Sequence, residues 1–203
     1  MINDGPTYYE SFKDIESVAE RMVQGKIGIF PSKNGYMLVG CGNEDIADKI
    51  RHLKQKTVRR PLVRIISSVK QDTAVLSAYN AQRAFVQDFI DYFMYSKLIV
   101  VFKCTGLIEF GEVGVAFALS PYERCLSACL GQPYFASSAN LENGKTPFKR
   151  EEVPAELLDS TDFLFNAGSF TSSIDYPVFC PENNIFIRGS SPLVEKYMNE
   201  YAQ

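Results

Sequence analysis

Leu53-Lys54-Gln55-Lys56-Thr57-Val58-Arg59-Arg60-Pro61-Leu62 is the stretch around which the rest of the chain can be organised. It places four cationic side chains within residues 54–60, in a chain whose net charge is -3. Residues 43–53 before it have the pattern of a short helix, and residues 62–67 after it that of a buried strand. A basic connection between two packed elements can present several cations to one anionic ligand. From charge alone, a solvated surface loop is the alternative.

The bulk composition is that of an ordinary globular protein. With 203 residues, 46% hydrophobic and 22% charged, we expect a single domain over 1–203. The N-terminus has no secretory signal pattern and no apolar run is long enough to span a membrane, so a cytoplasmic location is expected. The five cysteines contain no CxxC pair, which favours reduced thiols and no metal site. The mildly acidic balance does not indicate a protein that binds nucleic acid over its whole surface, so any such contact must come from a local patch.

Helical and strand patterns alternate along the chain, which predicts an α/β sheet partly covered by helices. A capping box at Ser11–Asp14 opens the first expected helix, and Gly25 closes it. The later helices are expected at 43–53, 81–92, 121–130, 151–158 and from Pro192 onward. The strands are expected at 27–30, 36–41, 62–67, 98–102, 113–119, 135–138, 163–165 and 185–187.

Polar turns follow several of these strands, at Pro31–Gly35, Ser138–Asn140 and Ser169–Ser173. Ligand crevices of open α/β sheets lie at strand ends, where turns supply N–H groups and hydroxyls to anions. Ser138 and Asn140 are two residues apart, so in an extended segment both side chains face the same way and could bind one ligand. The alternative is a turn in which both side chains satisfy their own backbone.

Nucleophilic catalysis has little support in the sequence. The only histidine, His52, falls inside an expected helix, and no GxSxG elbow is present. There is also no GxxxxGK[ST] loop and no GxGxxG segment. We therefore assign no catalytic residue, and expect any nucleotide to bind through lysines, arginines and hydroxyl-bearing turns.

Six short segments occur along the chain in the same order as the sequence motifs of a known protein family. They are residues 25–38 (GKIGIFPSKNGYML), 54–62 (KQKTVRRPL), 137–140 (SSAN), 166–168 (NAG), 172–175 (SSID) and 187–189 (IRG). Together they resemble the YrdC/TsaC/Sua family of L-threonylcarbamoyladenylate synthases, over nearly the whole chain. The resemblance implies a twisted, open mixed sheet with helices on its faces and a large basic cavity.

The resemblance also implies an activity. Family members join L-threonine, bicarbonate and ATP with Mg²⁺, release pyrophosphate, and supply threonylcarbamoyl-AMP for threonylcarbamoyladenosine in tRNA. Carried over by position, Lys54, Lys56 and Arg60 would face phosphates and the threonylcarbamate carboxylate. The resemblance further implies Ser138 and Asn140 at the adenylate, Arg188 at a phosphate or the nucleotide, and Ser32, Tyr36 and Ser172 at threonine. It implies tRNA or double-stranded RNA, and tRNA-modification proteins, as partners.

The sequence departs from the family pattern at several of these positions. Lys56 stands where the family has an arginine, so a bidentate fork becomes a point charge. Phe117 stands where the family has an arginine in a strand. An alternative is therefore a non-catalytic relative that binds a nucleotide or double-stranded RNA. A third is an α/β protein whose basic loop is only a surface feature.

Overall fold

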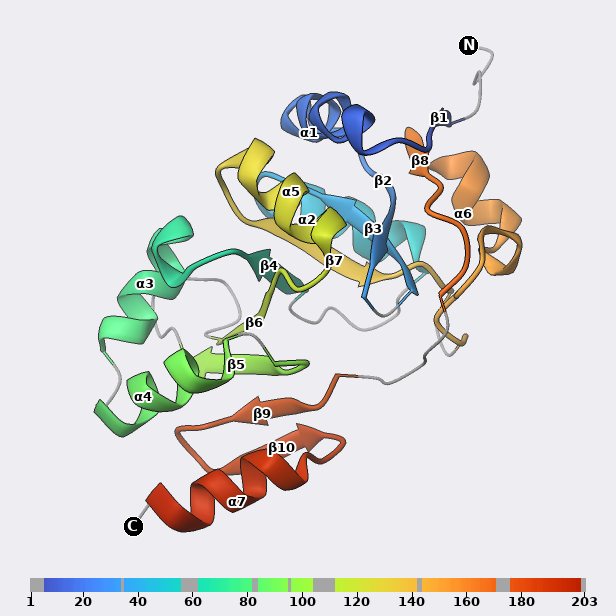
Figure 1. Cartoon of the computed structure of the whole chain (residues 1–203). Coiled ribbons are helices and arrows are strands. Elements are labelled where there is room, and N and C mark those ends of the chain that lie inside the picture. Colours follow the sequence, from blue (N-terminus) through green and yellow to red (C-terminus); the bar gives the residue numbers. More distant parts are fainter. Residues whose placement is uncertain are drawn as a thin grey trace.

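The computed structural model describes residues 6–33, 35–55, 62–81, 84–94, 96–103, 112–141, 144–170 and 176–201. In this part of the chain the strands form one ten-stranded sheet, in the order β1-β8-β2-β3-β7-β4-β6-β5-β9-β10 (Figure 1). Some neighbouring strands are parallel, such as β4 and β6, and others are antiparallel, such as β3 and β7, so the sheet is mixed. The predicted mixed α/β fold class is confirmed.

The strands are mostly short, and their bounds agree with most of the expected ones. They are β1 Thr7–Tyr9, β2 Gly28–Ser32, β3 Gly35–Gly40, β4 Val63–Ile66, β5 Ile99–Lys103, β6 Glu112–Phe117, β7 Tyr134–Ser138, β8 Phe163–Phe165, β9 Val178–Cys180 and β10 Ile185–Arg188.

The helices divide into seven α-helices and three short 3-10 turns within the described ranges. The α-helices are α1 Ile15–Val23, α2 Glu44–Leu53, α3 Thr73–Asn80, α4 Ala84–Phe93, α5 Pro121–Leu130, α6 Ala155–Ser160 and α7 Pro192–Tyr201. The 3-10 turns are η1 Phe12–Asp14, η2 Val69–Gln71 and η3 Arg150–Glu152.

Local capping explains where the helices that flank the site begin. Asn43 caps α2, because its side-chain oxygen accepts from the Asp45 N–H at 3.1 Å. Ser120 and Glu123 form a capping box at the start of α5, where Pro121 occupies the first helical position. The start of α5 is thereby fixed beside the end of β6.

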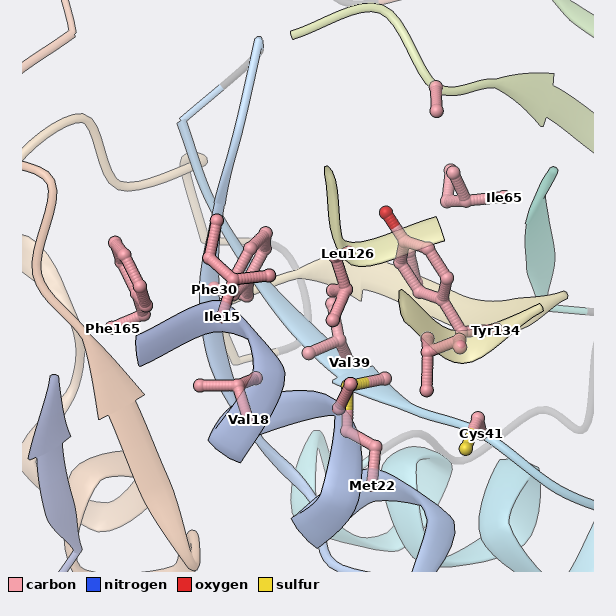
Figure 2. Close-up of a cluster of buried hydrophobic side chains, with 14 of the residues drawn as sticks. Ile15, Val18, Met22, Phe30, Val39, Cys41, Ile65, Leu126, Tyr134 and Phe165 are labelled. Carbon is pink, nitrogen blue, oxygen red and sulfur yellow. The ribbon is translucent and has the colours of Figure 1, made fainter. Parts of the chain in front are cut away.

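The two faces of the sheet bury different helices. Side chains alternate between the faces along each strand, so neighbours such as Val39 and Leu38 belong to different core clusters. One face packs against α1 and α5, in the cluster that Figure 2 shows with Phe30, Val39 and Tyr134 in its centre. The opposite face packs against α2 and α6 toward β1, and against α3, α4 and α7 toward β10.

Three elements were not expected from the sequence, and the helices expected at 81–92 and 151–158 begin later than predicted. Strands β1 and β9 have only three residues each, and α3 precedes α4 as a separate helix that Asp72 caps. The helix expected at 151–158 is instead η3 followed by α6. No helix in the described ranges is both long enough and apolar enough to cross a membrane.

Candidate functional site

Lys54 is the residue on which the site is centred. It is the C-cap of α2, and its side chain is almost entirely buried, with 3% of the residue exposed. Its ammonium Nζ lies 2.7 Å from both the carbonyl oxygen and Oδ1 of Asn140. It also donates to the carbonyl oxygen of Ser138 and lies 3.4 Å from the hydroxyl of Ser138. A buried cation is thus held against the turn that follows β7.

The side chains of this turn also bond to one another. The Ser138 hydroxyl donates to Asn140 Oδ1, and Asn140 Nδ2 donates to the carbonyl oxygen of Gly144. These bonds fix the amide orientation, with Oδ1 toward Lys54 and Nδ2 toward Gly144. The turn is therefore an ordered group of donors and acceptors with a positive charge behind it.

Lys54 is 84 positions from Ser138 and 86 from Asn140 in the sequence, and the pairing of β3 with β7 together with the end of α2 brings them into contact. Met37 lies opposite Ser138 in the antiparallel ladder, and the Ala139 N–H donates to the Tyr36 carbonyl oxygen at 2.9 Å. On the other side, α2 ends at Lys54 because Gln55 adopts a left-handed conformation with φ 53°. The end of α2 and the end of β7 therefore meet at Lys54.

Ser32 lies at the end of β2, and β3 lies between β2 and the strand β7 that leads into this turn. It is buried and pairs with Gly35 across the β2–β3 hairpin. Gly35 has φ +109°, and a Cβ there would lie 2.3 Å from the Pro147 carbonyl oxygen, so only glycine fits. By the ladder registers, Ser32 and Ser138 face the side of the sheet covered by α1 and α5.

Tyr36 points to the opposite face from Ser32. Its fully buried hydroxyl lies 2.8 Å from the Gly168 carbonyl oxygen and 3.0 Å from Asn166 Oδ1. It also accepts from the Ala167 N–H at 3.1 Å. Burial raises the pKa of this phenol, and the Ala167 N–H partly offsets the rise. Tyr36 thus holds the segment after β8 against β3.

Replacing Tyr36 with phenylalanine should lower the free energy of unfolding by about 0.5–1.5 kcal/mol, because the partly buried hydrogen bonds between its hydroxyl and the segment 166–168 would be lost. The measurement is chemical denaturation of Y36F. The matched control is Y92F, at a tyrosine that is 62% exposed. Equal stability of Y36F and Y92F would contradict a structural role for the Tyr36 hydroxyl.

Arg188 is separate from this group within the sheet. It is exposed on the edge strand β10, and its guanidinium donates to the Tyr176 carbonyl oxygen at 3.1 Å. In the strand order, β4, β6, β5 and β9 lie between β7 and β10. Three other predicted site residues, Lys56, Arg60 and Ser172, lie outside the described residues.

Phe117, which replaces the arginine of the family pattern, is a core residue. It is the last residue of β6, is 4% exposed, and lies opposite Ile66 of β4. Its ring belongs to the apolar cluster that also contains Phe89 and Phe102. An apolar side chain therefore occupies a position where the family pattern has a cation.

One surface pocket of about 580 Å³ lies beside α2, away from the Ser138 turn. Its polar lining has both signs of charge and consists of Lys26, Asp45, Asp48, Lys49, His52, Ser160 and Asp162. His52 is an exposed helix residue there, as its position in the expected helix predicted. The predicted large basic cavity would include Lys56 and Arg60, so it stays a prediction.

Sequence reasoning missed two buried polar groups near the site strands. On β4, Arg64 Nη1 lies 2.5 Å from Asp72 Oδ2, and its guanidinium lies 5.5 Å from the centre of the Phe135 ring. On the other face, the hydroxyl of buried Tyr176 has no hydrogen-bond partner among the described residues. Burial, and then the charge of Glu123, raises the pKa of this phenol. Of these groups, only Glu123 could have been recognised in the sequence, because Ser120 and Glu123 have the spacing of a capping box.

These features define a class of α/β protein that has a mixed sheet and a buried cation behind a Ser-Ala-Asn turn. A family model named for Sua5, YciO and YrdC, and described as telomere recombination, matches residues 20–188. The chain belongs to this Sua5/YciO/YrdC family.

Solved structures share the fold at low sequence identity. Sua5 of P. abyssi complexed with L-threonine is 18% identical, with a TM-score of 0.81 over 96% of this chain and 61% of that chain. E. coli YciO is 16% identical, with a TM-score of 0.75 over 90% of this chain and 93% of that chain. Full-length HypF in its phosphate- and nucleotide-bound form is 20% identical, with a TM-score of 0.66 over 82% of this chain and 27% of that chain.

The chain spans about three fifths of the Sua5 chains that it matches. A comparison with curated proteins finds no match. The solved structures therefore establish the fold, and the family model establishes the family.

Proposed function

We propose that this protein is an L-threonylcarbamoyladenylate synthase of the YrdC type. It would form threonylcarbamoyl-AMP and pyrophosphate from L-threonine, bicarbonate and ATP. Family membership supports this proposal, as does the fold shared with a Sua5 that is complexed with L-threonine. The observation that carries it is the buried Lys54 ammonium behind the Ser138–Asn140 turn.

The proposed reaction has two bond-forming steps. The threonine amine adds to the carbon of bicarbonate or of CO₂ derived from it, and a carbamate forms with loss of water or of a proton. A carbamate oxygen then attacks the α-phosphorus of ATP, and pyrophosphate leaves. Each step brings negative groups together, so fixed cations and oriented donors that offset their repulsion would lower the barrier. Holding the three reactants in one place would account for much of the remaining rate enhancement.

The described residues offer suitable groups for this task. Ser138 and Asn140 would meet the adenylate, with the charge of Lys54 behind them, and Ser32 would lie toward threonine on the same sheet face. Tyr36 would act by holding the segment 166–168 in place. By family position, the proposed set also includes Lys56, Arg60 and Ser172. It includes Arg188 as well, although four strands lie between β10 and β7.

Mg²⁺ is assigned to the ATP phosphates in this proposal. In nucleotide sites Mg²⁺ is commonly bound by substrate phosphates and waters, with few protein ligands. In the described ranges, no group of three or more His, Cys, Asp or Glu side chains could hold a metal ion. The metal would neutralise phosphate charge, and no protein-bound metal step is proposed.

The test is threonine-dependent release of pyrophosphate from ATP in bicarbonate buffer. We expect release that requires threonine and falls at least tenfold in S138A, which would lose a hydroxyl from the turn. The control is S190A, at an exposed serine after β10, which should retain the wild-type rate. ATP binding without threonine-dependent release would exclude the synthase.

The burial of Phe117 favours a second candidate function. Without a cation at that position, less of the negative charge of the reactants is neutralised during catalysis. Other cations of the chain could still bind an anionic ligand. The protein would then bind a nucleotide or double-stranded RNA without turnover. RNA binding through phosphate contacts must weaken as salt rises, so affinity for an RNA duplex that is independent of salt would count against the RNA part of this alternative.

The product of the proposed reaction is a mixed anhydride that an amine of adenosine in tRNA would consume. The protein would therefore act before a tRNA-modifying transferase, and tRNA-modification proteins are its proposed partners.

A further inference from the structure

We propose that the Ser138–Asn140 turn is a cradle for a monovalent cation, and that the Lys54 ammonium is its built-in occupant. Removing the Lys54 side chain should then open a site for free ammonium or potassium ions. Lys54 would act as a positioning residue, which fixes the turn and places a charge behind it. The cradle does not depend on the reaction proposed above.

The oxygens around Nζ are those of a cation site. Asn140 contributes its carbonyl oxygen and Oδ1, both at 2.7 Å, and Ser138 contributes its carbonyl oxygen. The Ser138 hydroxyl lies further away, at 3.4 Å. All four oxygens are uncharged, and three of them come close enough to use the three N–H bonds of one ammonium.

The cradle is rigid for reasons other than Lys54. Ser138 is the last residue of β7 and pairs with Met37. The Asn140 N–H donates to the Ser138 carbonyl oxygen at 2.9 Å, and the Asn140 amide is fixed by Gly144. The three oxygens should therefore keep their places when the ammonium is removed, as a preformed site requires.

The lack of charge on the oxygens selects the class of cation. Divalent ions are bound mainly by carboxylates, whereas the oxygens around the Lys54 ammonium are neutral. Carbonyl oxygens can replace the hydration shell of potassium. Ammonium and potassium are thus the expected occupants.

The arrangement explains how Lys54 could serve a ligand without touching it. The ammonium arrives from α2, while the Ser138 side chain faces the side of the sheet covered by α1 and α5. A charge in a partly buried place is less screened than one in water. An anion beside the turn would therefore be attracted by the charge of Lys54 even though the ammonium itself is bonded to Ser138 and Asn140.

The first experiment compares K54A with K54M in choline, ammonium and potassium chlorides at equal ionic strength. K54A should melt roughly 5–10 °C below the wild type in choline chloride. About 100 mM ammonium or potassium should restore part of that loss by binding only the folded state. K54M is the matched control, because its side chain fills the space without a charge and should show no restoration.

Crystals of K54A soaked in rubidium chloride give the second experiment. We expect an anomalous peak between the carbonyl oxygens of Ser138 and Asn140 and Asn140 Oδ1. The same melting response in K54A, K54M and the wild type, or K54A crystals with no such peak, would overturn the proposal.

A third measurement uses the wild type and covers the case in which K54A does not fold. Lysine labelled with ¹⁵N should show one side-chain ammonium signal with slow hydrogen exchange, and K54M should lack it. If K54A does not fold, this signal supports the proposal that the Lys54 ammonium occupies the cradle. Absence of the signal from the wild type overturns the proposal.

Discussion

Replacing Asn140 with alanine should lower the free energy of unfolding by about 3 kcal/mol, because a buried charge and two neutral groups would lose partners. The Lys54 ammonium and the Ser138 hydroxyl would lose Oδ1, and the Gly144 carbonyl oxygen would lose Nδ2. Chemical denaturation measures this change. ATP binding should weaken as well, because the turn that would meet the adenylate is no longer held.

The control for this result is N199A, at an exposed asparagine of α7, which should change stability by less than about 0.5 kcal/mol. The double variant K54M/N140A should lose less than the sum of the single variants, with a coupling of about 1 kcal/mol or more. Strict additivity would mean that Lys54 and Asn140 do not form one unit.

Replacing Phe117 with arginine should lower the free energy of unfolding by about 3–5 kcal/mol, because a charge would enter an apolar cluster. Phe117 is 4% exposed and packs among apolar side chains of β4, β5 and α4. The melting temperature should fall by more than about 8 °C. F117L is the matched control, and an apolar substitution of similar size should cost less than about 1.5 kcal/mol.

The F117R variant also shows whether an arginine at position 117 would reach the ligand or enter the core. A folded F117R with increased pyrophosphate release would mean that position 117 reaches the ligand. The core position described above would then be wrong. An unfolded F117R beside a stable F117L would show that this chain has rebuilt the position as part of its core.

Local chemistry made several elements predictable. Helix α5 begins at Pro121 and ends before Gly131, as the capping box and a left-handed glycine with φ 61° require. Strand β8 has the predicted bounds, since Phe163–Phe165 is bounded by polar residues. Strand β9 was missed because three residues carry too little pattern, and its place depends on pairing with β5 and β10.

The site was predictable only in part. The meeting of Lys54 with Ser138 and Asn140 depends on how β3, β7 and α2 assemble, and no local rule predicts a contact across 84 residues. Only the order of family motifs placed these residues together. Alternation along strands could have separated Ser32 from Tyr36, which face opposite sides of the sheet. The same rule could have placed Phe117 with Val115 in the core.

The most direct test of the proposed synthase is to detect its product. The protein is incubated with ATP, Mg²⁺, L-threonine and ¹³C-bicarbonate, and the mixture is analysed by mass spectrometry. We expect threonylcarbamoyl-AMP that carries one ¹³C atom, together with one pyrophosphate for each product molecule. Bound ATP with no ¹³C-labelled adenylate would contradict the proposal.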